Sequence, residues 1–442
     1  MAFSNMLWLY AEDVKYYRRD YVLSLERKYK KVLIAPSEEE IRQEIRKGEE
    51  FVVLAPYMPP EEFKSFFAYM ELNNTHGLWT EQDIKLLKEL SLSEGELLEK
   101  KTGFKIYKPD LQGKKLIGVS GVQRYIRSVK DIKDPKLKPK GVLLVGLPGT
   151  GKSFSAKVAA HELGGFLVEF NIARLLEMEN PVFFLHSLFS YLEKASKQGE
   201  KFILWIDEIE KAFGKNEGRE KQIFGQLLTI LNDINDTGYK LNGLFWVTAN
   251  NIIQIMDSNP EFFRKGRFDE LFFVDTPLKK DAVEIANFYC GYYGVDYSGR
   301  KSFGEEMVEI VDNYVYADKA MKEGSHEADR FLYVPAEIEQ IAKAMAIRQH
   351  LVRKFISGDS SLYPLLFPRS LERGDMDVRR FLYVKMGSAN PEDIRRYYAL
   401  HNNKVNDLDL FVVLKSMEPL SVSMAQAVAK MRSNERFFTR AD

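Results

Sequence analysis

Several features that mark particular classes of protein are missing from this chain of 442 residues. Its one cysteine, Cys290, excludes an internal disulfide framework and suits a reducing compartment. Lysine and arginine number 64, as do aspartate and glutamate, so no net charge draws the chain to nucleic acid or to an anionic membrane. The six histidines are scattered without metal-ligand spacing, so we expect no zinc site.

Long apolar runs are also missing. None is long enough to cross a bilayer, and the apolar stretch within residues 1–20 is too short for a signal peptide. We therefore expect a cytoplasmic protein with no membrane partner. The composition, 45% hydrophobic and 29% charged, is typical of globular chains that bury a core, and the length suits about three domains.

Strand and helix patterns alternate through the middle of the chain. Strands are predicted at the compact apolar runs 141–146, 166–171, 201–207, 244–250 and 270–277. Such alternation predicts an α/β fold, in which a parallel sheet carries helices on both faces.

The two flanks of this region differ from it. Apolar runs at 31–36 and 50–56 predict a small N-terminal α/β unit, in which no catalytic constellation is visible, so we expect a scaffold or partner-binding role. After Asp281 only helical periods are visible. The segment 357–375, rich in Gly, Ser and Pro, interrupts them and is interpreted as a loop or insertion.

The strongest chemical signal is GLPGTGKS at 146–153, which matches G-x-x-x-x-G-K-[ST] between a predicted strand and a helical run. Its glycines let successive N–H groups surround phosphate oxygens, and the helix N-terminus adds its positive end. Lys152 would reach the β- and γ-phosphates, and Ser153 would hold Mg²⁺. An ordinary glycine-rich turn is the disfavoured alternative. ATP and Mg²⁺ are therefore expected, with nucleotide-binding residues Pro148, Gly149, Thr150, Gly151, Lys152, Ser153 and Phe154.

A second signal is ILWIDEIE, an apolar strand that ends in Asp207 and Glu208. Buried strands do not end on paired carboxylates without a task, because unpaired buried charge is costly. Asp207 can face the same Mg²⁺, and Glu208 can polarise a water for attack on the γ-phosphate. Asn250 ends another predicted strand and could orient that water, although asparagine at a strand end is more often turn chemistry.

From about Leu116 to Ile341 the chain resembles the AAA branch of the AAA+ ATPases, and within it the hypothetical-reading-frame AAA proteins of chloroplasts and their bacterial relatives. The likeness rests on the motifs above and on FFRKGRFDE (262–270), PAEIEQ (335–340) and PLSVSM (419–424). The likeness is faint over the first hundred residues and absent over roughly 345–405. Together with the patterns described above, it leads us to expect an ATPase with three domains. These are an N-terminal α/β domain (1–112), a P-loop α/β core (113–278) and a helical lid (279–442) with an insertion around 345–405.

The resemblance gives the two arginines of FFRKGRFDE a role. In AAA rings they reach the nucleotide of the neighbouring subunit, where a guanidinium stabilises charge that develops on the γ-phosphate. Arg264 would be this arginine finger and Arg267 its partner or support. A homo-oligomer is thereby implied, with a hexameric ring favoured.

The resemblance also implies residues around the base. Ile117 and Gly118 would lie beside adenine through their backbone, and Ala336 would occupy the lid position next to the nucleotide. The family has Gly-Ala at this lid position, whereas this chain has Pro335–Ala336.

Three functions stay open at this point: a remodeller of a protein partner, a nucleic-acid-associated ATPase, and a scaffold whose assembly the nucleotide times. The pore-loop triplet of AAA unfoldases is missing. Only Phe183 and Phe184 could grip a substrate, and after Pro181 they are expected to pack in a helix. The basic stretch 124–140 suggests nucleic acid, but a solvated face and linker are favoured. The protein partner itself cannot be named.

Overall fold

The chain divides into two compact units, Met1–Phe104 and Lys105–Asp442. A computed structural model is the basis of the description. It describes residues 6–10, 27, 31–34, 43, 47, 51–55, 104–130, 132, 137, 139–177, 181–212, 241–250, 267–316, 329–369, 376–433 and 435–442. No helix in these ranges is both long and apolar enough to cross a membrane.

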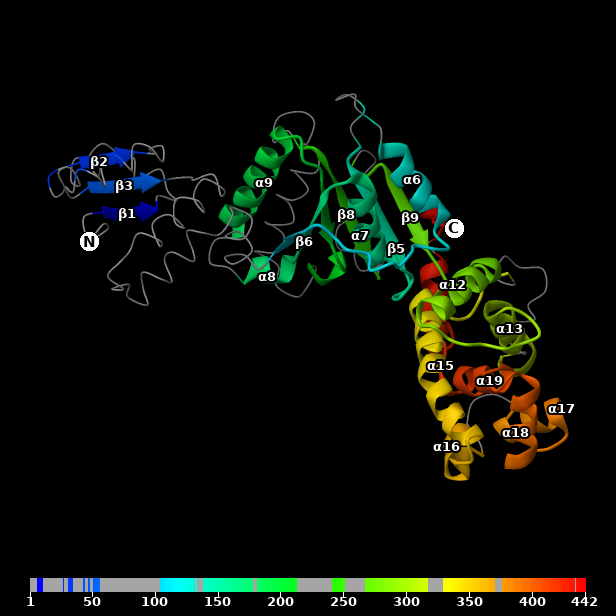
Figure 1. The fold of residues 1–442 in the computed structure, drawn as a ribbon. Helices are drawn as coiled ribbons and strands as arrows, with labels where there is room; N and C mark the ends of the chain where they lie inside the picture. The colour runs from blue at the N-terminus through cyan, green and yellow to red at the C-terminus, as the bar shows by residue number, and fades with distance from the viewer. Residues whose placement is uncertain are drawn as a thin grey trace. The chain divides into compact units, whose positions relative to one another are not determined.

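The first unit contains a parallel sheet of three strands, β1 (Met6–Tyr10), β2 (Lys31–Ile34) and β3 (Phe51–Ala55), with β3 in the centre (Figure 1). The strands expected within 31–36 and 50–56 are confirmed. Strand β1 is not among the predicted strands, because the apolar run that contains MLWLY is interpreted only as too short for a signal peptide.

The second unit is built on a seven-stranded sheet with the order β10-β9-β5-β8-β7-β6-β4. Its five central strands are parallel and lie where the sequence predicted them: β5 (Gly141–Gly146), β6 (Phe166–Phe170), β7 (Phe202–Ile206), β8 (Gly243–Ala249) and β9 (Glu270–Val274). The edge strands β4 (Lys105–Tyr107), which is antiparallel, and β10 (Thr439–Arg440) were not predicted. They are too short for their residues to show a period.

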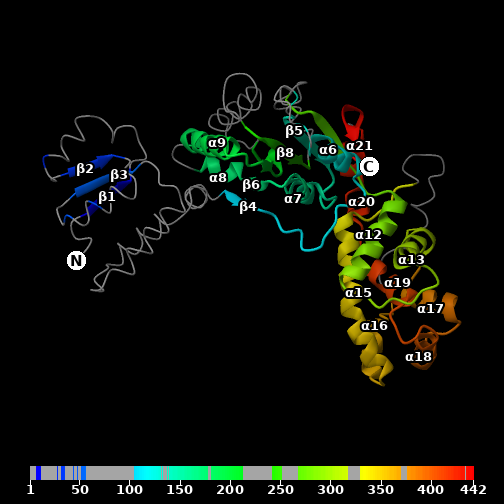
Figure 2. The same cartoon turned by 45° about the horizontal axis from the view of Figure 1, so that its top comes forward.

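Helices cover both faces of this sheet (Figures 1 and 2). On one face, α6 (Ser120–Lys130) and α7 (Lys152–Leu163) pack against alternate strand residues such as Leu144 and Trp246. On the other, α9 (Pro181–Lys197) stacks Phe189 on Phe245, with ring centroids 6.3 Å apart. The predicted α/β fold of the P-loop ATPases is confirmed. The carboxyl ends of its parallel strands meet at one edge, where such sheets bind ligands.

After β9 the chain forms a helical part (Figure 1). The helices are α12 (Lys279–Tyr292), α13 (Phe303–Ile310), the π-helical η5 (Val311–Val315), α15 (Pro335–Ile356), α17 (Val378–Met386), α18 (Pro391–Leu400) and α19 (Asp407–Ser416). Residues 407–415 of α19 are all buried, so this helix forms the middle of the part. We call the helical part the lid.

The predicted loop at 357–375 is helical in part. Residues Ser360–Leu362 form the 3-10 helix η6 and Tyr363–Leu366 form α16. Asp359 accepts a hydrogen bond from Ser361 N–H and so caps the turn, and a proline stands in the first turn of α16, where its missing N–H costs nothing. Turn-forming residues there start helices rather than exclude them.

The expectation of helices alone after Asp281 is wrong at its end. The chain passes through α20 (Leu420–Ser423), α21 (Ala425–Arg432) and the 3-10 helix η7 (Glu435–Phe437), and then returns to the sheet as β10. Ala441 N–H donates to Phe273 O (3.1 Å), and Gly121 N–H donates to Ala441 O (2.7 Å). A Cβ at Gly121 would lie 3.0 Å from that carbonyl oxygen, so glycine permits the close approach.

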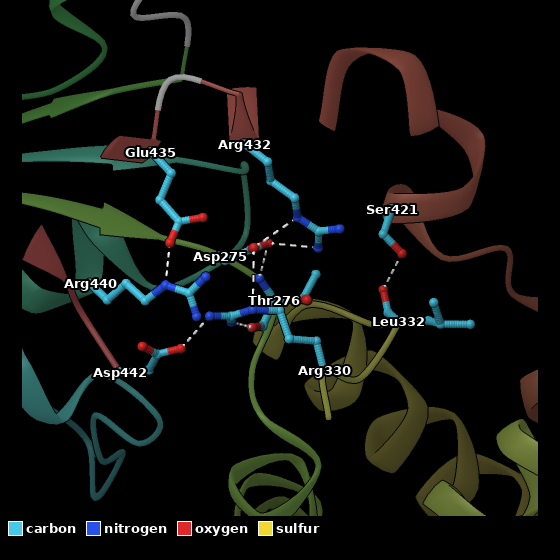
Figure 3. A network of polar contacts seen from close by, with 9 residues as sticks. All are labelled: Asp275, Thr276, Arg330, Leu332, Ser421, Arg432, Glu435, Arg440 and Asp442. Atoms are coloured by element: carbon cyan, nitrogen blue, oxygen red, sulfur yellow. Dashed lines mark hydrogen bonds and ion pairs between the residues drawn. The ribbon is translucent and has the colours of Figure 1, made fainter. Parts of the chain in front are cut away.

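Charged side chains fix the connection between sheet and lid (Figure 3). Asp275, directly after β9, receives two hydrogen bonds from Arg432 of α21 (2.8 and 3.0 Å) and lies 3.4 Å from Arg330 Nε. Arg330 also binds Thr276 O and the Asp442 carboxylate, both at 2.5 Å. We call Asp275, Thr276, Arg330, Arg432 and Asp442 the core–lid junction.

Candidate nucleotide-binding site

A cavity of about 320 Å³ lies at the carboxyl edge of the sheet, between the sheet and the lid. Pockets for small molecules are commonly this large. Its lining brings together most of the predicted site residues: 148–154, Asp207, Glu208, Asn250, Ile117 and Ala336. Gly118 and Arg267 do not line it, and Arg264 lies outside the described residues.

The loop 146–151 joins β5 to α7 and forms one wall. Gly149 has φ 77°, a conformation that glycine adopts without strain, and a Cβ there would lie 3.0 Å from Val334 Cγ2 and 3.2 Å from Ala336 Cβ. At Gly146 a Cβ would collide with Val274 O at 1.9 Å. The motif glycines therefore permit both the turn and the close approach of the neighbouring strand and the lid.

The amino group of Lys152 lies under this loop. Lys152 is 6% exposed, and its Nζ donates to Gly146 O (2.8 Å) and Leu147 O (2.6 Å). Burial lowers the pKa of Lys152 to about 8, and the charge of Glu210, followed by those of Asp207 and Glu208, opposes that shift. Negative phosphate oxygens would favour the charged ammonium in the same way.

Asp207, directly after β7, places its carboxylate oxygens at the cavity, where they could bind a metal ion. Its Oδ1 accepts hydrogen bonds from Ser153 Oγ (2.9 Å) and Thr248 Oγ1 (2.5 Å). A hydroxyl and a carboxylate so close together fit Mg²⁺, which takes few protein oxygens and completes its octahedron with water and substrate phosphates. Within the described ranges, no three His, Cys, Asp or Glu side chains are grouped to hold a metal. The Ser153 hydroxyl and the Asp207 carboxylate therefore fit a Mg²⁺ that a bound nucleotide would help to hold.

Glu208 is held in an unusual backbone conformation. Its φ is 49°, which costs a non-glycine residue about 1–3 kcal/mol and is typical of functional sites. Two bonds hold it: Glu208 N–H donates to Thr248 Oγ1 (3.0 Å), and Asn250 Nδ2 donates to Glu208 Oε1 (2.7 Å). Sequence reasoning missed Thr248, although it precedes Asn250 by two residues in the predicted strand 244–250, where residues two apart share a face.

The lid touches the phosphate-binding loop at the start of α15. Ala336 N–H donates to Gly149 O (3.0 Å). Pro335 opens the helix at a position that suits proline, and the Glu337 carboxylate accepts N–H bonds from Val334 (2.8 Å) and Leu420 (2.7 Å). The Pro-Ala pair is thus compatible with a lid that reaches the loop.

Further lid residues that we did not predict also line the cavity. They are Tyr289 of α12 and Glu339 of α15, and Lys114 from the segment before α6 lines it as well. Glu339 Oε1 accepts hydrogen bonds from Lys114 Nζ (2.8 Å) and Tyr293 OH (2.7 Å). Burial opposes ionisation of Glu339, but these bonds outweigh it and hold its pKa below the usual range. No local pattern could reveal partners 225 residues apart.

Of the described residues predicted to lie beside adenine or to reach the neighbouring subunit, Ile117 lines the cavity, whereas Gly118 and Arg267 do not. Gly118 has φ 78°, and a Cβ there would lie 3.3 Å from Asp281 Cβ of α12. Arg267 is 6% exposed, so its guanidinium is buried within its own chain. The structure therefore groups the phosphate-side residues, and it places Arg267 outside this group.

The family comparison agrees with this geometry. Residues 142–276 match the family described as "ATPase family associated with various cellular activities (AAA)". These residues form an AAA domain. The predicted family is thereby confirmed for this part of the chain.

Several curated proteins are similar over the AAA domain. An uncharacterized AAA domain-containing protein ycf46 of Guillardia theta is 41% identical over 154 residues, which are 32% of this chain and 27% of that protein. The ATP-dependent zinc metalloprotease FtsH of Leptotrichia buccalis is 35% identical, over 48% of this chain and 28% of its own. A proteasome-activating nucleotidase of Methanococcus maripaludis is 27% identical, over 52% of this chain and 60% of its own. The chain thus spans less than a third of the first two relatives.

Solved AAA domains are also similar in structure. The crystal structure of the FIGL-1 AAA domain covers 83% of this chain and 99% of its own, at 17% identity and a TM-score of 0.49. The complex of that domain with ADP covers 78% of this chain and 97% of its own, at 15% identity and a TM-score of 0.48.

Proposed function

We propose that the chain binds ATP with Mg²⁺, hydrolyses it, and acts as a ring or partial ring that remodels a protein partner. One observation supports ATP hydrolysis in particular. The hydrogen-bonded pair Glu208–Asn250 lines the same cavity as Lys152, Ser153 and Asp207. The relatives named as ATP-dependent or as nucleotidases support the same activity. The partner, the ring and the cytoplasmic location remain predictions.

The proposed mechanism assigns each side chain one task. The N–H groups of the loop hold the phosphates, and Lys152 turns from the loop carbonyls to the β- and γ-phosphates. A Mg²⁺ at Ser153 and Asp207 would neutralise charge on these phosphates. Glu208 takes a proton from the attacking water, and Asn250 holds the Glu208 carboxylate in place.

Two variants test the hydrolase. Glu208→Gln keeps the shape of the side chain but cannot act as a base, so it should bind ATP and fail to turn it over. Lys152→Ala should lose most affinity, because the charge on the phosphates is removed. Binding is measured by calorimetry and turnover by phosphate release. If Glu208→Gln turns over ATP at the wild-type rate, Glu208 is not the catalytic base. If Lys152→Ala binds ATP tightly, the loop 146–151 is not the phosphate-binding loop.

The nature of the partner needs a separate experiment. Arg124, Arg127 and Lys130 are exposed on α6, which keeps the nucleic-acid alternative testable. Stimulation of the ATPase by single-stranded DNA or RNA, with a steep salt dependence, would favour that alternative over remodelling. Phe183 and Phe184 lie in α9, as expected for helical residues. Replacing both with alanine should abolish work on a threaded substrate but not the basal ATPase, whereas a scaffold should be unaffected.

A further inference from the structure

A third carboxylate, Glu210, lies just behind the proposed catalytic pair. It belongs to the 3-10 helix η3 (Ile209–Ala212), and it does not line the cavity. Its Oε1 accepts the backbone N–H of Asn250 at 2.9 Å. Its Oε2 is buried without a hydrogen-bond partner among the described residues. An unsatisfied buried oxygen is costly, so some gain must offset it.

The bond from Asn250 to Glu210 lies where the sheet can no longer support the chain. The pairing of β8 ends at Val247 on the β7 side and at Ala249 on the β5 side. The N–H of Asn250 is therefore beyond both ladders, and Glu210 supplies the acceptor that a strand would otherwise provide.

Two consecutive hydrogen bonds then connect Glu210 to the proposed base. Glu210 fixes the backbone of Asn250 (2.9 Å), and the Asn250 amide donates to Glu208 Oε1 (2.7 Å). A small rotation of the Asn250 backbone would swing this amide away from Glu208. Displacements of about 1 Å in such a set of groups can cost about 100-fold in rate.

The charge of Glu210 acts in the same region. Among the acidic groups it does most to raise the pKa of Lys152, which burial lowers. Burial raises the pKa of Glu210 itself, and the N–H of Asn250 opposes this rise most strongly. The bond and the charge are thus separable by substitution, because glutamine keeps an acceptor oxygen but has no charge.

We propose that Glu210 is a positioning residue for hydrolysis: it holds Asn250 so that the Asn250 amide aims Glu208 at the attacking water. This inference rests on the proposed ATPase function. Glu210 acts through Asn250 and does not line the cavity.

The test compares Glu210→Ala with Glu210→Gln. Alanine removes the acceptor and should lower kcat by about 10- to 100-fold, with the KM for MgATP within about threefold of wild type. Glutamine should retain kcat within about threefold. Combining Glu210→Ala with Asn250→Ala should slow turnover no further than Asn250→Ala alone, because residues in one network are not additive. The exposed Glu200→Ala is the matched control and should have no effect.

The outcomes separate this role from its alternatives. Normal kcat in Glu210→Ala would overturn it, and so would a Glu210→Gln variant as slow as alanine, since charge rather than the bond would then matter. Thermal unfolding of each variant identifies a merely structural loss, and if the alanine variant does not fold, the glutamine variant still decides. A wild-type chain without ATPase activity would instead overturn the proposed function on which this role rests.

Discussion

Lys114 and Glu339 form an ion pair of 2.8 Å that connects the segment before α6 with the lid helix α15. Both residues line the cavity, as does the phosphate-binding loop. The same helix contacts that loop through Ala336 and Gly149. Helix α15 thus contacts the core at two points beside the cavity, and we expect these contacts to slow the release of a bound nucleotide.

Breaking the ion pair should speed nucleotide release. The pair is partly exposed, with side-chain exposures of 30% and 18%, so its loss should increase the release rate by only about two- to fivefold. We expect this for Lys114→Met, measured by stopped-flow release of a fluorescent ADP analogue. Lys115→Met removes the same charge from the same cavity wall without a bond to Glu339 and should release at the wild-type rate. Equal rates for the two variants would contradict the attachment.

The core–lid junction should contribute strongly to stability. Asp275 is 3% exposed and Arg330 6%, and removing one member of such a buried pair costs about 3–5 kcal/mol. Asp275→Ala should lower the free energy of unfolding of the second unit by about this amount in urea titrations. As a control, Lys197→Ala breaks the exposed pair with Glu193 (3.3 Å) and should cost no more than about 0.5 kcal/mol. If the free energy lost in Asp275→Ala is no larger than the small loss expected for the control, the junction is dispensable for stability.

The sheet and the phosphate side of the cavity could be predicted because their signals are local. Each central strand is a short apolar run with clear ends, and parallel strands bring their carboxyl ends to one edge. Asp207 and Asn250 follow two such strands, so their proximity to the loop at 146–153 followed from the order of patterns alone.

The remainder depends on contacts between residues far apart in the chain. No periodic pattern or sequence motif marks these contacts before the chain folds. Examples are the pair Lys114–Glu339, the junction at Asp275 and the two-residue strand β10. Glu210 was visible in ILWIDEIE, but its bond to the backbone of Asn250 depends on where β8 ends. Such features are fixed by tertiary packing.

The only cysteine provides a test by pH. Cys290 lies on α12 with Sγ 3.6 Å from Val295 O, and burial raises its pKa to about 11. Because the thiolate is the reactive form, only about one molecule in a thousand should react readily at pH 8. Alkylation by iodoacetamide, followed by intact mass, should be slow there and rise about tenfold per unit up to pH 10. The chain unfolded in urea is the control. Fast labelling of the folded chain at pH 7.5 would contradict the burial.

Of the two arginines in the segment 262–270, the structure describes Arg267 but not Arg264. Arg264 lies outside the described residues, so its role as a finger stays a prediction from the resemblance. Arg267 is 6% exposed within its own chain, and a buried guanidinium cannot reach a neighbour without moving. Of the two roles considered for Arg267, support for Arg264 is therefore the one that we carry forward.

If Arg264 acts on a neighbouring subunit, each active site is complete only at an interface. Arg264→Ala should then bind ATP normally, since the phosphate contacts are in its own chain, and lose about 10³-fold in turnover. Wild-type specific activity should rise with protein concentration, because interfaces form by mass action. A mixture of Arg264→Ala with Lys152→Ala chains should regain activity, as one supplies the loop and the other the finger. Normal turnover by Arg264→Ala, with specific activity unchanged on dilution, would exclude the ring and leave a site that works alone.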